Sequence, residues 1–387
     1  MRNSVHRYPL IKSERITDSK YMKVLHFKTT YLNESETFID RLVRNHQEFS
    51  PVVATCNKQA FTDGLDVHEM PNSGFSGLVN TIQLKLNSSP QFLYKVFEQE
   101  KPDVVHGHFG LDSYRLIPVI KKFNTPFIVN FYGHDVIRLP QEFGWTTRYN
   151  RLKKHLDFAI AGSDDMKRNL AKLGFDTERI KTIKLAVDLE KIQFQQRDLA
   201  GFNIMMVGRL VEKKGFIYAI RAVSMLREKF PDLQMNIFGD GELLEVLKLE
   251  VAALDLENIV HFMGFKDNEE IIRQLHRHDM LLVPSVQGRD GDREGIPQTT
   301  VEGMATGIPV IATDHAGLPE LIKDEKTGLQ VPERDSEALS LAIQKLIQSP
   351  ETVKKVSHEG RKKVEEEHNI IKQVFKTEKL YKMLLCD

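Results

Sequence analysis

Residues 293–309 read REGIPQTTVEGMATGIP, and the segments on either side of this stretch indicate a parallel α/β sheet. The apolar run MLLV at 280–283 ends in a proline and a polar loop, which is typical of a buried strand and its carboxyl-end loop. A helix is expected from Pro297, whose fixed φ suits a first turn, to Gly307, which stops it. A second apolar run, PVIA at 309–312, follows. The order strand, loop, helix, strand is one unit of a parallel sheet.

Two carboxylates stand in this stretch, Glu294 in the loop and Glu302 near the start of the helix. The first N–H groups of a helix lack intrahelical partners and carry the positive end of its dipole, so Thr299 and Thr300 are placed to bind phosphate. Each carboxylate can accept hydrogen bonds from sugar hydroxyls. The stretch therefore combines the means to bind an anion and a polyol. The plain alternative is two unrelated glutamates on a solvated face.

Length and composition indicate a globular protein of two domains. The 387 residues exceed a single ordinary core, and hydrophobic residues make up 41% and charged residues 28% of the chain. Two cysteines are too few for a disulfide framework or a thiolate metal site, which suits a reducing cytoplasm. The first twenty residues contain no apolar segment typical of a signal peptide, and no apolar run approaches the roughly 20 residues of a membrane helix.

The net charge of zero is unevenly divided along the chain. Residues 1–186 contain 27 Lys and Arg against 20 Asp and Glu, a net +7, and residues 187–387 contain 27 against 34, a net −7. A basic amino-terminal half favours an anionic partner such as a membrane surface. Ordinary surface variation is the alternative.

Short apolar runs alternate with helical patterns in two successive series, which predicts two parallel sheets rather than one. The strands are expected at 22–27, 52–55, 104–106, 127–131 and 158–161 in the first series, and at 203–207, 234–238, 259–262, 280–283 and 309–312 in the second. The aperiodic segment 183–202 is interpreted as the connection. We place the domains at 1–186 and 187–360, followed by a helical segment at 361–387.

The strand at 203–207 runs directly into GRLVEKKG at 208–215, after which a helix is expected to about residue 229. Glycines at both ends of this loop allow tight backbone geometry, and Arg209 and Lys214 supply positive charge at the carboxyl edge of the sheet. Basic groups are unfavourable beside the positive end of a helix dipole, so an anion is expected there to offset them. A basic helix start without a ligand is the alternative.

The strand at 127–131 is followed by Tyr132, Gly133, His134 and Asp135, so a histidine stands at the carboxyl end of a parallel strand. Ligands bind at that edge in open α/β sheets. A histidine there offers a donor and an acceptor near neutral pH, although a loop histidine without a ligand is the alternative. His106 and His108, at the end of another strand, are weaker candidates.

Together these motifs resemble the signature of family 4 retaining glycosyltransferases, enzymes of the GT-B architecture. The resemblance rests on E-x7-E with G-I-P inside it, on G-R-x4-K-G, on Y-G-H-D, and on YLNESETFI at 31–39. The last element is similar to one in bacterial exopolysaccharide glycosyltransferases. The family fold implies two Rossmann-like domains, an interdomain cleft, and a carboxyl-terminal helix that crosses back to the first domain.

The resemblance also implies roles for single residues. His134 and Glu294 are the implied catalytic residues, with His134 facing the transferred sugar. The implied donor-binding residues are Gly208, Arg209, Lys214, Gly295, Ile296, Thr299, Thr300 and Glu302. Within that set Arg209 and Lys214 neutralise the leaving diphosphate, and Glu302 is expected to bind the ribose. Ser35 and Asp135 are placed on the acceptor side, and the alternative for Ser35 is a helix N-cap without a ligand.

The expected reaction is transfer of a hexose-type sugar from a nucleoside-diphosphate sugar to a glycan or a polyprenyl-diphosphate-linked acceptor during cell-surface polysaccharide synthesis. The expected location is the cytoplasm, with peripheral contact to an anionic membrane. Because fixed cations and N–H groups face the diphosphate, no metal and no cofactor are expected, and no nucleic acid is an expected partner. The alternatives are a GT-B nucleotide-sugar epimerase and a catalytically silent nucleotide-sugar-binding subunit.

Overall fold

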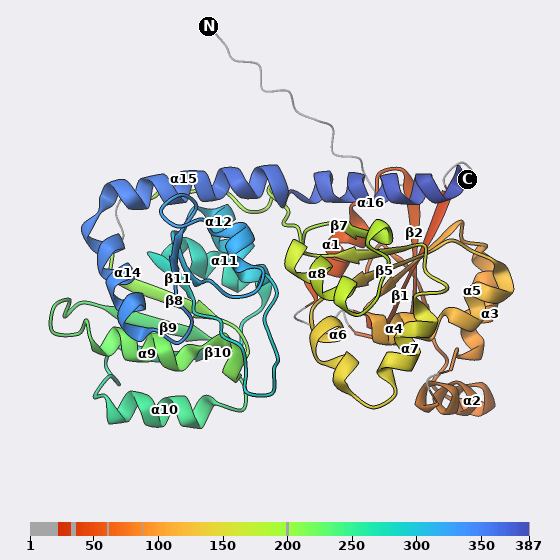
Figure 1. Ribbon diagram of the computed structural model, residues 1–387, viewed down its shortest axis with the longest axis horizontal. Coiled ribbons are helices and arrows are strands. Elements are labelled where there is room, and N and C mark those ends of the chain that lie inside the picture. The colour runs from red at the N-terminus through yellow and green to blue at the C-terminus, as the bar shows by residue number, and fades with distance from the viewer. Residues whose placement is uncertain (1–21, 32–35, 60–61, 87, 199–200, 387) are drawn as a thin grey trace, which may run out of the picture.

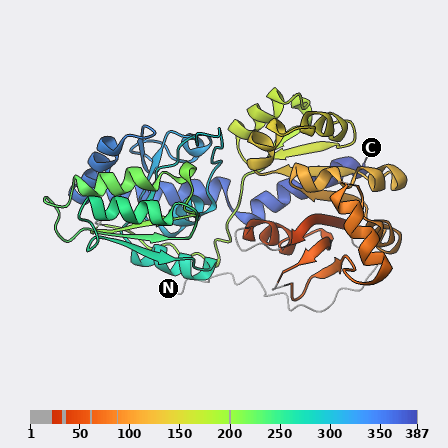
Figure 2. The ribbon, with the colours of Figure 1, turned by 90° about the horizontal axis from the view of Figure 1, so that it is seen from below.

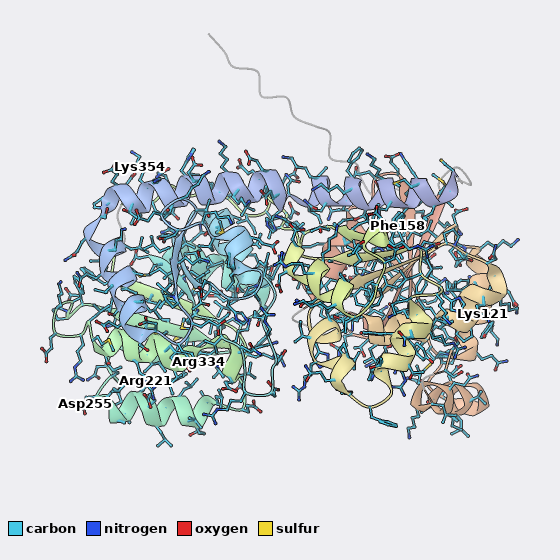
Figure 3. The ribbon with its side chains drawn as sticks, in the orientation of Figure 1. Lys121, Phe158, Arg221, Asp255, Arg334 and Lys354 are labelled. Atoms are coloured by element: carbon cyan, nitrogen blue, oxygen red, sulfur yellow. The ribbon has the colours of Figure 1, made fainter. Side chains whose placement is uncertain are left out.

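The computed structural model describes residues 22–31, 36–59, 62–86, 88–198 and 201–386, which form two α/β domains lying side by side (Figures 1 and 2). Each domain is built on one parallel sheet. Side chains fill the space between the sheets and the helices that cover them (Figure 3). The prediction of two successive parallel sheets is confirmed.

Within the described residues the first sheet has seven strands in the order β3-β2-β1-β4-β5-β6-β7, and all neighbouring pairs are parallel. These strands are β1 (Met22–Tyr31), β2 (Phe49–Lys58), β3 (Asp66–Glu69), β4 (Val104–His108), β5 (Phe127–Phe131), β6 (Phe158–Ala161) and β7 (Ile180–Thr182). The helices of this domain are α1 (Thr37–Arg44), α2 (Gly74–Lys85), α3 (Gln91–Glu100), α4 (Gly110–Tyr114), α5 (Ile117–Phe123), α6 (His134–Ile137), α7 (Trp145–Leu152) and α8 (Asp164–Lys172), with 3-10 turns η1 (Leu139–Gln141) and η2 (Thr177–Arg179).

The second sheet has six strands over the described part of the chain, in the order β10-β9-β8-β11-β12-β13, again all parallel. They are β8 (Asn203–Val207), β9 (Gln234–Phe238), β10 (Val260–Gly264), β11 (Met280–Val283), β12 (Val310–Thr313) and β13 (Leu329–Val331). The remaining helices are η3 (Glu212–Lys214), α9 (Phe216–Ser224), α10 (Leu244–Ala253), α11 (Asn268–Arg277), α12 (Gln298–Thr306), α13 (Leu318–Leu321), α14 (Ser336–Gln348), α15 (Pro350–Glu367) and α16 (Ile370–Leu385). No helix of the described chain combines the length and the apolar character that crossing a membrane requires.

The segment 293–309 folds as a loop and a helix between β11 and β12, as predicted. Pro297 is a correction, because its ψ of 133° is extended and makes it the residue before α12 instead of its first residue. Gly307 ends the helix in the left-handed conformation, with φ 87°. The helix expected to reach about residue 229 is also shorter, since α9 ends at Ser224.

The carboxyl-terminal helices cross from the second domain to the first. α15 and α16 follow one another along one edge of the molecule (Figure 1). The break between them lies at His368 and Asn369, and the Asn369 side chain caps α16 by accepting from the Ile371 amide at 2.9 Å. The predicted start of this segment at 361 lies inside α15. Apolar residues of α16 complete a core under the first sheet, and this core contains Val24, Phe49, Val104, Ile128, Ile160, Ile183, Leu380 and Tyr381.

A chain of buried histidines connects α16 to the first sheet. The carboxylate of Glu378 on α16 lies 3.1 Å from His46 Nδ1, and His46 Nε2 lies 2.9 Å from His26 Nε2. The other nitrogen of His26 is 3.0 Å from His108 Nε2, and His108 Nδ1 is 2.8 Å from the Tyr132 hydroxyl. A second branch joins the Tyr381 hydroxyl of α16 to His106.

All these contacts are satisfied by one assignment of neutral tautomers. Tyr132 donates to His108, His108 to His26, His26 to His46, and His46 to the ionised Glu378. An imidazolium at His26 would donate from both nitrogens, which would reverse the tautomer of His108 and make the Tyr132 hydroxyl an acceptor. Burial lowers the pKa of His106 to about 3 and holds the pKa values of His26 and His108 well below their ordinary value of 6.5.

These depressed pKa values predict a pH-dependent stability. The unfolded chain takes up protons at these histidines below pH 6.5 while the folded chain does not, so the stabilisation is complete above pH 6.5 and is lost as the pH falls toward 3. Each imidazole changes the free energy of unfolding by up to about 1.4 kcal/mol per pH unit in this window. Denaturant unfolding of His106→Gln between pH 7.5 and 4.5 should therefore give a shallower slope than wild type.

The matched control is His358→Gln, since His358 is exposed on α15 and its substitution should leave the slope unchanged. Equal slopes for wild type and His106→Gln would contradict the assignment of a neutral, buried His106.

Candidate active site

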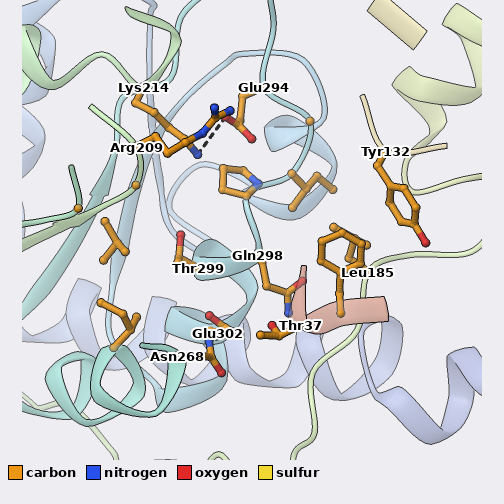
Figure 4. Close-up of a pocket in the computed structure, with 18 of the residues that line it drawn as sticks. Thr37, Tyr132, Leu185, Arg209, Lys214, Asn268, Glu294, Gln298, Thr299 and Glu302 are labelled. Carbon is orange, nitrogen blue, oxygen red and sulfur yellow. Dashed lines mark hydrogen bonds and ion pairs between the residues drawn. The ribbon is translucent and has the colours of Figure 1, made fainter. Parts of the chain in front are cut away.

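A cavity of about 400 Å³ lies between the two domains, which is within the range of small-molecule sites. Both sheets contribute the residues at their carboxyl ends, and the connecting segment adds Leu185 (Figure 4). The main lining residues are Thr37, Phe38, Phe131, Tyr132, Gly162, Ser163 and Met166 from the first domain and Gly208, Arg209, Lys213, Lys214, Gly239, Asp240, Asn268, Glu294, Gly295, Ile296, Gln298, Thr299 and Glu302 from the second. An interdomain cleft was predicted, and the strand ends meet there.

The ion pair of Lys214 and Glu294 joins two of the predicted motifs at one wall of this cavity. Lys214 Nζ lies 2.9 Å from Glu294 Oε2 (Figure 4). Lys213 Nζ lies 3.0 Å from Asp292 and 4.0 Å from Glu294, so two ammonium groups share this wall. Arg209 is exposed beside them. Three basic side chains thus stand against the two carboxylates of Asp292 and Glu294, and the excess of positive charge at this wall favours a diphosphate.

Glu294 is ionised at neutral pH. Burial would raise its pKa, but the charges of Lys214 and Lys213 outweigh burial and lower the pKa below its usual value. An ionised carboxylate can accept hydrogen bonds from sugar hydroxyls and can stabilise a developing positive charge, whereas it has no proton to give to a leaving group.

Two glycines allow the strand-end loops to approach one another closely. Gly215 has φ +68°, and a Cβ there would lie 1.8 Å from the carbonyl oxygen of Pro284 in the loop after β11. Gly239 has φ +138°, and a Cβ would lie 1.9 Å from the carbonyl oxygen of Gly208. The loops after β8, β9 and β11 therefore pack backbone against backbone, which places Lys214 beside the loop that carries Glu294.

Glu302 occupies the opposite part of the cavity wall. Its side chain is 0% exposed, and Oε1 accepts hydrogen bonds from Asn268 Nδ2 at 3.0 Å and from Arg41 Nη2 at 2.9 Å. Arg41 belongs to α1 of the first domain, so this ion pair bridges the domains. Arg41 Nη2 also donates to Asn268 Oδ1 at 2.7 Å.

The start of α12 lies between these two walls. Gly295, Ile296, Gln298 and Thr299 line the cavity, and the first N–H groups of the helix lack intrahelical partners. Thr300 differs from its neighbours, because it is fully buried, does not line the cavity, and donates its N–H to the carbonyl oxygen of Pro297.

The site residues that were predicted in the first domain, His134 and Asp135, are not among the residues that line the cavity. His134 is exposed at the start of α6 and is not a lining residue, although Tyr132 two positions earlier is. Asp135 is buried, and its carboxylate accepts from the backbone N–H groups of Gly110 and Tyr132, both at 2.9 Å. Asp135 thus joins the loop after β5 to the start of α4. Ser35 lies outside the described residues.

Sequence reasoning missed several lining or adjacent residues, namely Thr37, Arg41, Tyr132, Leu185, Lys213, Asp240, Asn268 and Gln298. Lys213 lies within the predicted motif GRLVEKKG and Tyr132 begins the predicted motif Y-G-H-D, so the motifs themselves could have indicated both residues. Asn268 follows Asp267, whose side chain caps α11 just after β10, and that capping pattern could have drawn attention to it.

Family models match both halves of the chain. The model described as Glycosyltransferase Family 4 matches residues 37–191, and the model described as Glycosyl transferases group 1 matches residues 188–363. The amylovoran biosynthesis glycosyltransferase AmsK of Erwinia amylovora is 36% identical over 271 residues, which cover 69% of this chain and 67% of AmsK.

The chain belongs to glycosyltransferase family 4. The aligned part of this glycosyltransferase spans about two thirds of AmsK and 60% of WcaL, an Escherichia coli protein named for colanic acid biosynthesis that is 34% identical over 62% of this chain. The comparisons give no support to an epimerase or a silent subunit.

Solved structures confirm the GT-B fold of the glycosyltransferase. Anabaena HepE in complex with UDP-glucose superposes with a TM-score of 0.74 at 19% identity, covering 92% of this chain and 99% of that chain. Sucrose-phosphate synthase from Thermosynechococcus elongatus has a TM-score of 0.75 at 16% identity, covering 94% of this chain and 99% of that chain. At these identities the likeness concerns the fold alone.

The charged wall predicts separate roles for its two partners. Lys214→Ala should raise the Kd for a nucleoside diphosphate about 10- to 100-fold, since a lost charge-assisted contact costs about 1.5–3 kcal/mol. Glu294→Ala should retain nucleotide affinity and lose sugar-dependent turnover. Titration calorimetry measures the first effect and a turnover assay the second.

Lys248→Ala is the matched control, because Lys248 pairs only with Glu245 on α10 among the described contacts. An unchanged nucleotide affinity in Lys214→Ala would show that the diphosphate lies elsewhere.

Proposed function

We propose that this glycosyltransferase transfers a hexose-type sugar from a nucleoside-diphosphate sugar, with retention of configuration, to a glycan or lipid-linked acceptor in the synthesis of an exopolysaccharide. The observation that carries the proposal is the interdomain cavity with the Lys214–Glu294 pair at one wall and buried Glu302 at the other. The names of AmsK and WcaL support the exopolysaccharide, and the UDP-glucose complex of HepE supports the class of donor.

In the proposed reaction the bond between the sugar C1 and the diphosphate oxygen breaks, and its electron pair leaves with the nucleotide. The acceptor hydroxyl oxygen bonds to C1 on the same face, and its proton passes to the departing diphosphate. Lys214, Arg209 and the N–H groups at the start of α12 stabilise the charge that develops on that diphosphate. The ionised Glu294 offsets positive charge on the sugar. Because fixed cations supply this stabilisation, we expect no metal requirement.

Substitution of His134 tests whether the first domain acts in sugar transfer while the second domain binds the nucleotide. His134 is exposed two residues after the lining residue Tyr132, so its proposed action on the bound sugar needs a direct test. If it aligns the reacting groups, His134→Ala should bind the nucleoside diphosphate like wild type and transfer sugar at least tenfold more slowly. Purified protein is incubated with a panel of nucleotide sugars, with and without lipid extract and with and without EDTA. Nucleotide release and sugar transfer are measured together.

Transfer from one donor of the panel, unaffected by EDTA, is the expected result for wild type. An epimerised donor would contradict the proposal and indicate a nucleotide-sugar epimerase. Donor binding without turnover would indicate a catalytically silent subunit. If His134→Ala transfers sugar at the wild-type rate, His134 has no role in the reaction and is an ordinary loop histidine.

We further propose that the first domain attaches reversibly to an anionic membrane. The exposed apolar residues Leu78, Ile82 and Leu86 lie on α2 or at its end, and Phe143 is fully exposed before α7. Basic residues on the same domain are Lys121, Lys122, Arg148, Arg151, Lys153, Lys154, Lys167 and Arg168, and Figure 3 shows Lys121 at the side of this domain away from the second. Each basic residue near the lipid contributes about 1 kcal/mol.

Cosedimentation with phosphatidylserine-containing vesicles measures this attachment. Binding should fall steeply above 0.1 M salt, where charge is screened within about 10 Å, and Leu78→Ser with Leu86→Ser should weaken it further. Leu249→Ser, an exposed leucine of α10 in the second domain, is the matched control. If the protein does not bind these vesicles at low salt, the membrane proposal is wrong, and the +7 charge of residues 1–186 is ordinary surface variation.

A further inference from the structure

Arg41 reaches from the first domain to a carboxylate that the second domain places in the donor cavity. It lies on α1 one helical turn after Thr37, which lines the cavity, so the two residues share a helix face. Its guanidinium contacts both Glu302 and Asn268, which are also lining residues. Figure 4 shows Asn268 and Glu302 adjacent in the same part of the cavity, with Thr37 nearby.

On each of the two side chains, one buried polar atom has no hydrogen-bond partner in the described part of the chain. Arg41 Nη1 and Glu302 Oε2 are buried, and neither has a hydrogen-bond partner among the described residues. The other carboxylate oxygen of Glu302 is already shared by Arg41 and Asn268. Buried polar atoms in native proteins are nearly always paired, so an unpaired donor and an unpaired acceptor in one ion pair point to a missing ligand.

The chemistry of these two atoms selects the kind of ligand group. A guanidinium nitrogen can only donate, and an ionised carboxylate oxygen can only accept. A hydroxyl does both, so one hydroxyl or a vicinal pair can satisfy both atoms at once. The cavity also holds the cationic wall of Lys214, which is expected to bind the diphosphate. The sugar hydroxyls of a nucleotide fit the Glu302 end.

We propose that Arg41 is a donor-binding residue of the first domain, which together with Glu302 binds the ribose hydroxyls of the nucleotide. This inference rests on the proposed function, because it assumes a nucleoside-diphosphate donor. Its consequence is that both domains contact the nucleoside, so the bound donor holds the interdomain cleft closed. Lysine would serve less well, because it presents a point charge instead of the planar fork that can contact Glu302 and a hydroxyl together.

The test compares a ribonucleotide with its analogue that lacks the hydroxyls. The probe is the nucleoside diphosphate that wild type binds most tightly among UDP, GDP, ADP and CDP, together with its 2′,3′-dideoxy form. In calorimetry Arg41→Met should raise the Kd of the ribonucleotide about tenfold or more and change that of the dideoxy form less than about twofold. Arg41→Lys should lie between wild type and Arg41→Met, and thermal melting verifies that each variant is folded.

Two control variants distinguish a direct contact of Arg41 with the ligand from two indirect effects. One effect is a weaker contact between the domains, and the other is the loss of a positive charge on α1. Glu320 of α13 accepts from the backbone N–H groups of Asp164 and Asp165 at 2.9 and 2.7 Å, across the domain boundary and away from Arg41. Glu320→Gln should therefore change both Kd values by the same factor. Arg44→Gln, on the same helix but paired with Asp40, should change neither.

If Arg41→Met weakens both nucleotides equally, or weakens neither, Arg41 does not bind ribose and the inference is overturned. If Glu302→Gln loses the preference for the ribonucleotide while Arg41→Met keeps it, the proposed function stands and Arg41 alone is excluded. A wild-type protein that binds none of these nucleotides overturns both. Should Arg41→Met fail to fold, the shift in preference of Arg41→Lys decides.

Discussion

The parallel direction of all neighbouring strands in both described sheets is the constraint on which the site depends. Lateral hydrogen bonds satisfy the strand backbones, so the loops at the carboxyl ends are free to carry chemistry. Because the two sheets direct those ends toward one cavity, segments far apart in the chain meet there. The loop after β8 supplies Lys214, the loop after β11 supplies Glu294, and the end of β5 supplies Tyr132.

The loops at the carboxyl ends of the second sheet are held together by close contacts between their backbones. A side chain at Gly215 or Gly239 would overlap a carbonyl oxygen of a neighbouring loop, so glycine is required for the loops to pack as they do. The result is an ion pair of 2.9 Å between groups that different loops hold in place. Such preorganisation lets charge stabilisation act without moving the protein during the reaction.

The crossing of α16 adds a second polar connection, between the outer helix and the cavity wall. The histidine chain begins at Glu378 on α16 and ends at Tyr132, which lines the cavity. Because each imidazole of the assigned chain accepts at one nitrogen and donates at the other, the packing of α16 and the position of the Tyr132 hydroxyl are coupled through one set of tautomers. The neighbouring Arg41–Glu302 pair joins the domains by charge, and the histidine chain joins the first domain to the helix that returns from the second.

The sequence by itself determined the alternation of strands and helices, the two-domain architecture and the motifs that face the cavity, because hydrophobic period and glycine placement are local properties. The strands at 127–131, 203–207 and 280–283 have the predicted limits. The edge strands β3, β7 and β13 were not predicted, since DVHE, IKT and LQV are too short and too polar to show a period. The pairing of Arg41 with Glu302, the histidine chain, and the burial of Thr300 and Asp135 were decided by tertiary structure alone. These contacts join residues up to 332 positions apart, and no local pattern encodes which distant side chain will fill a given space.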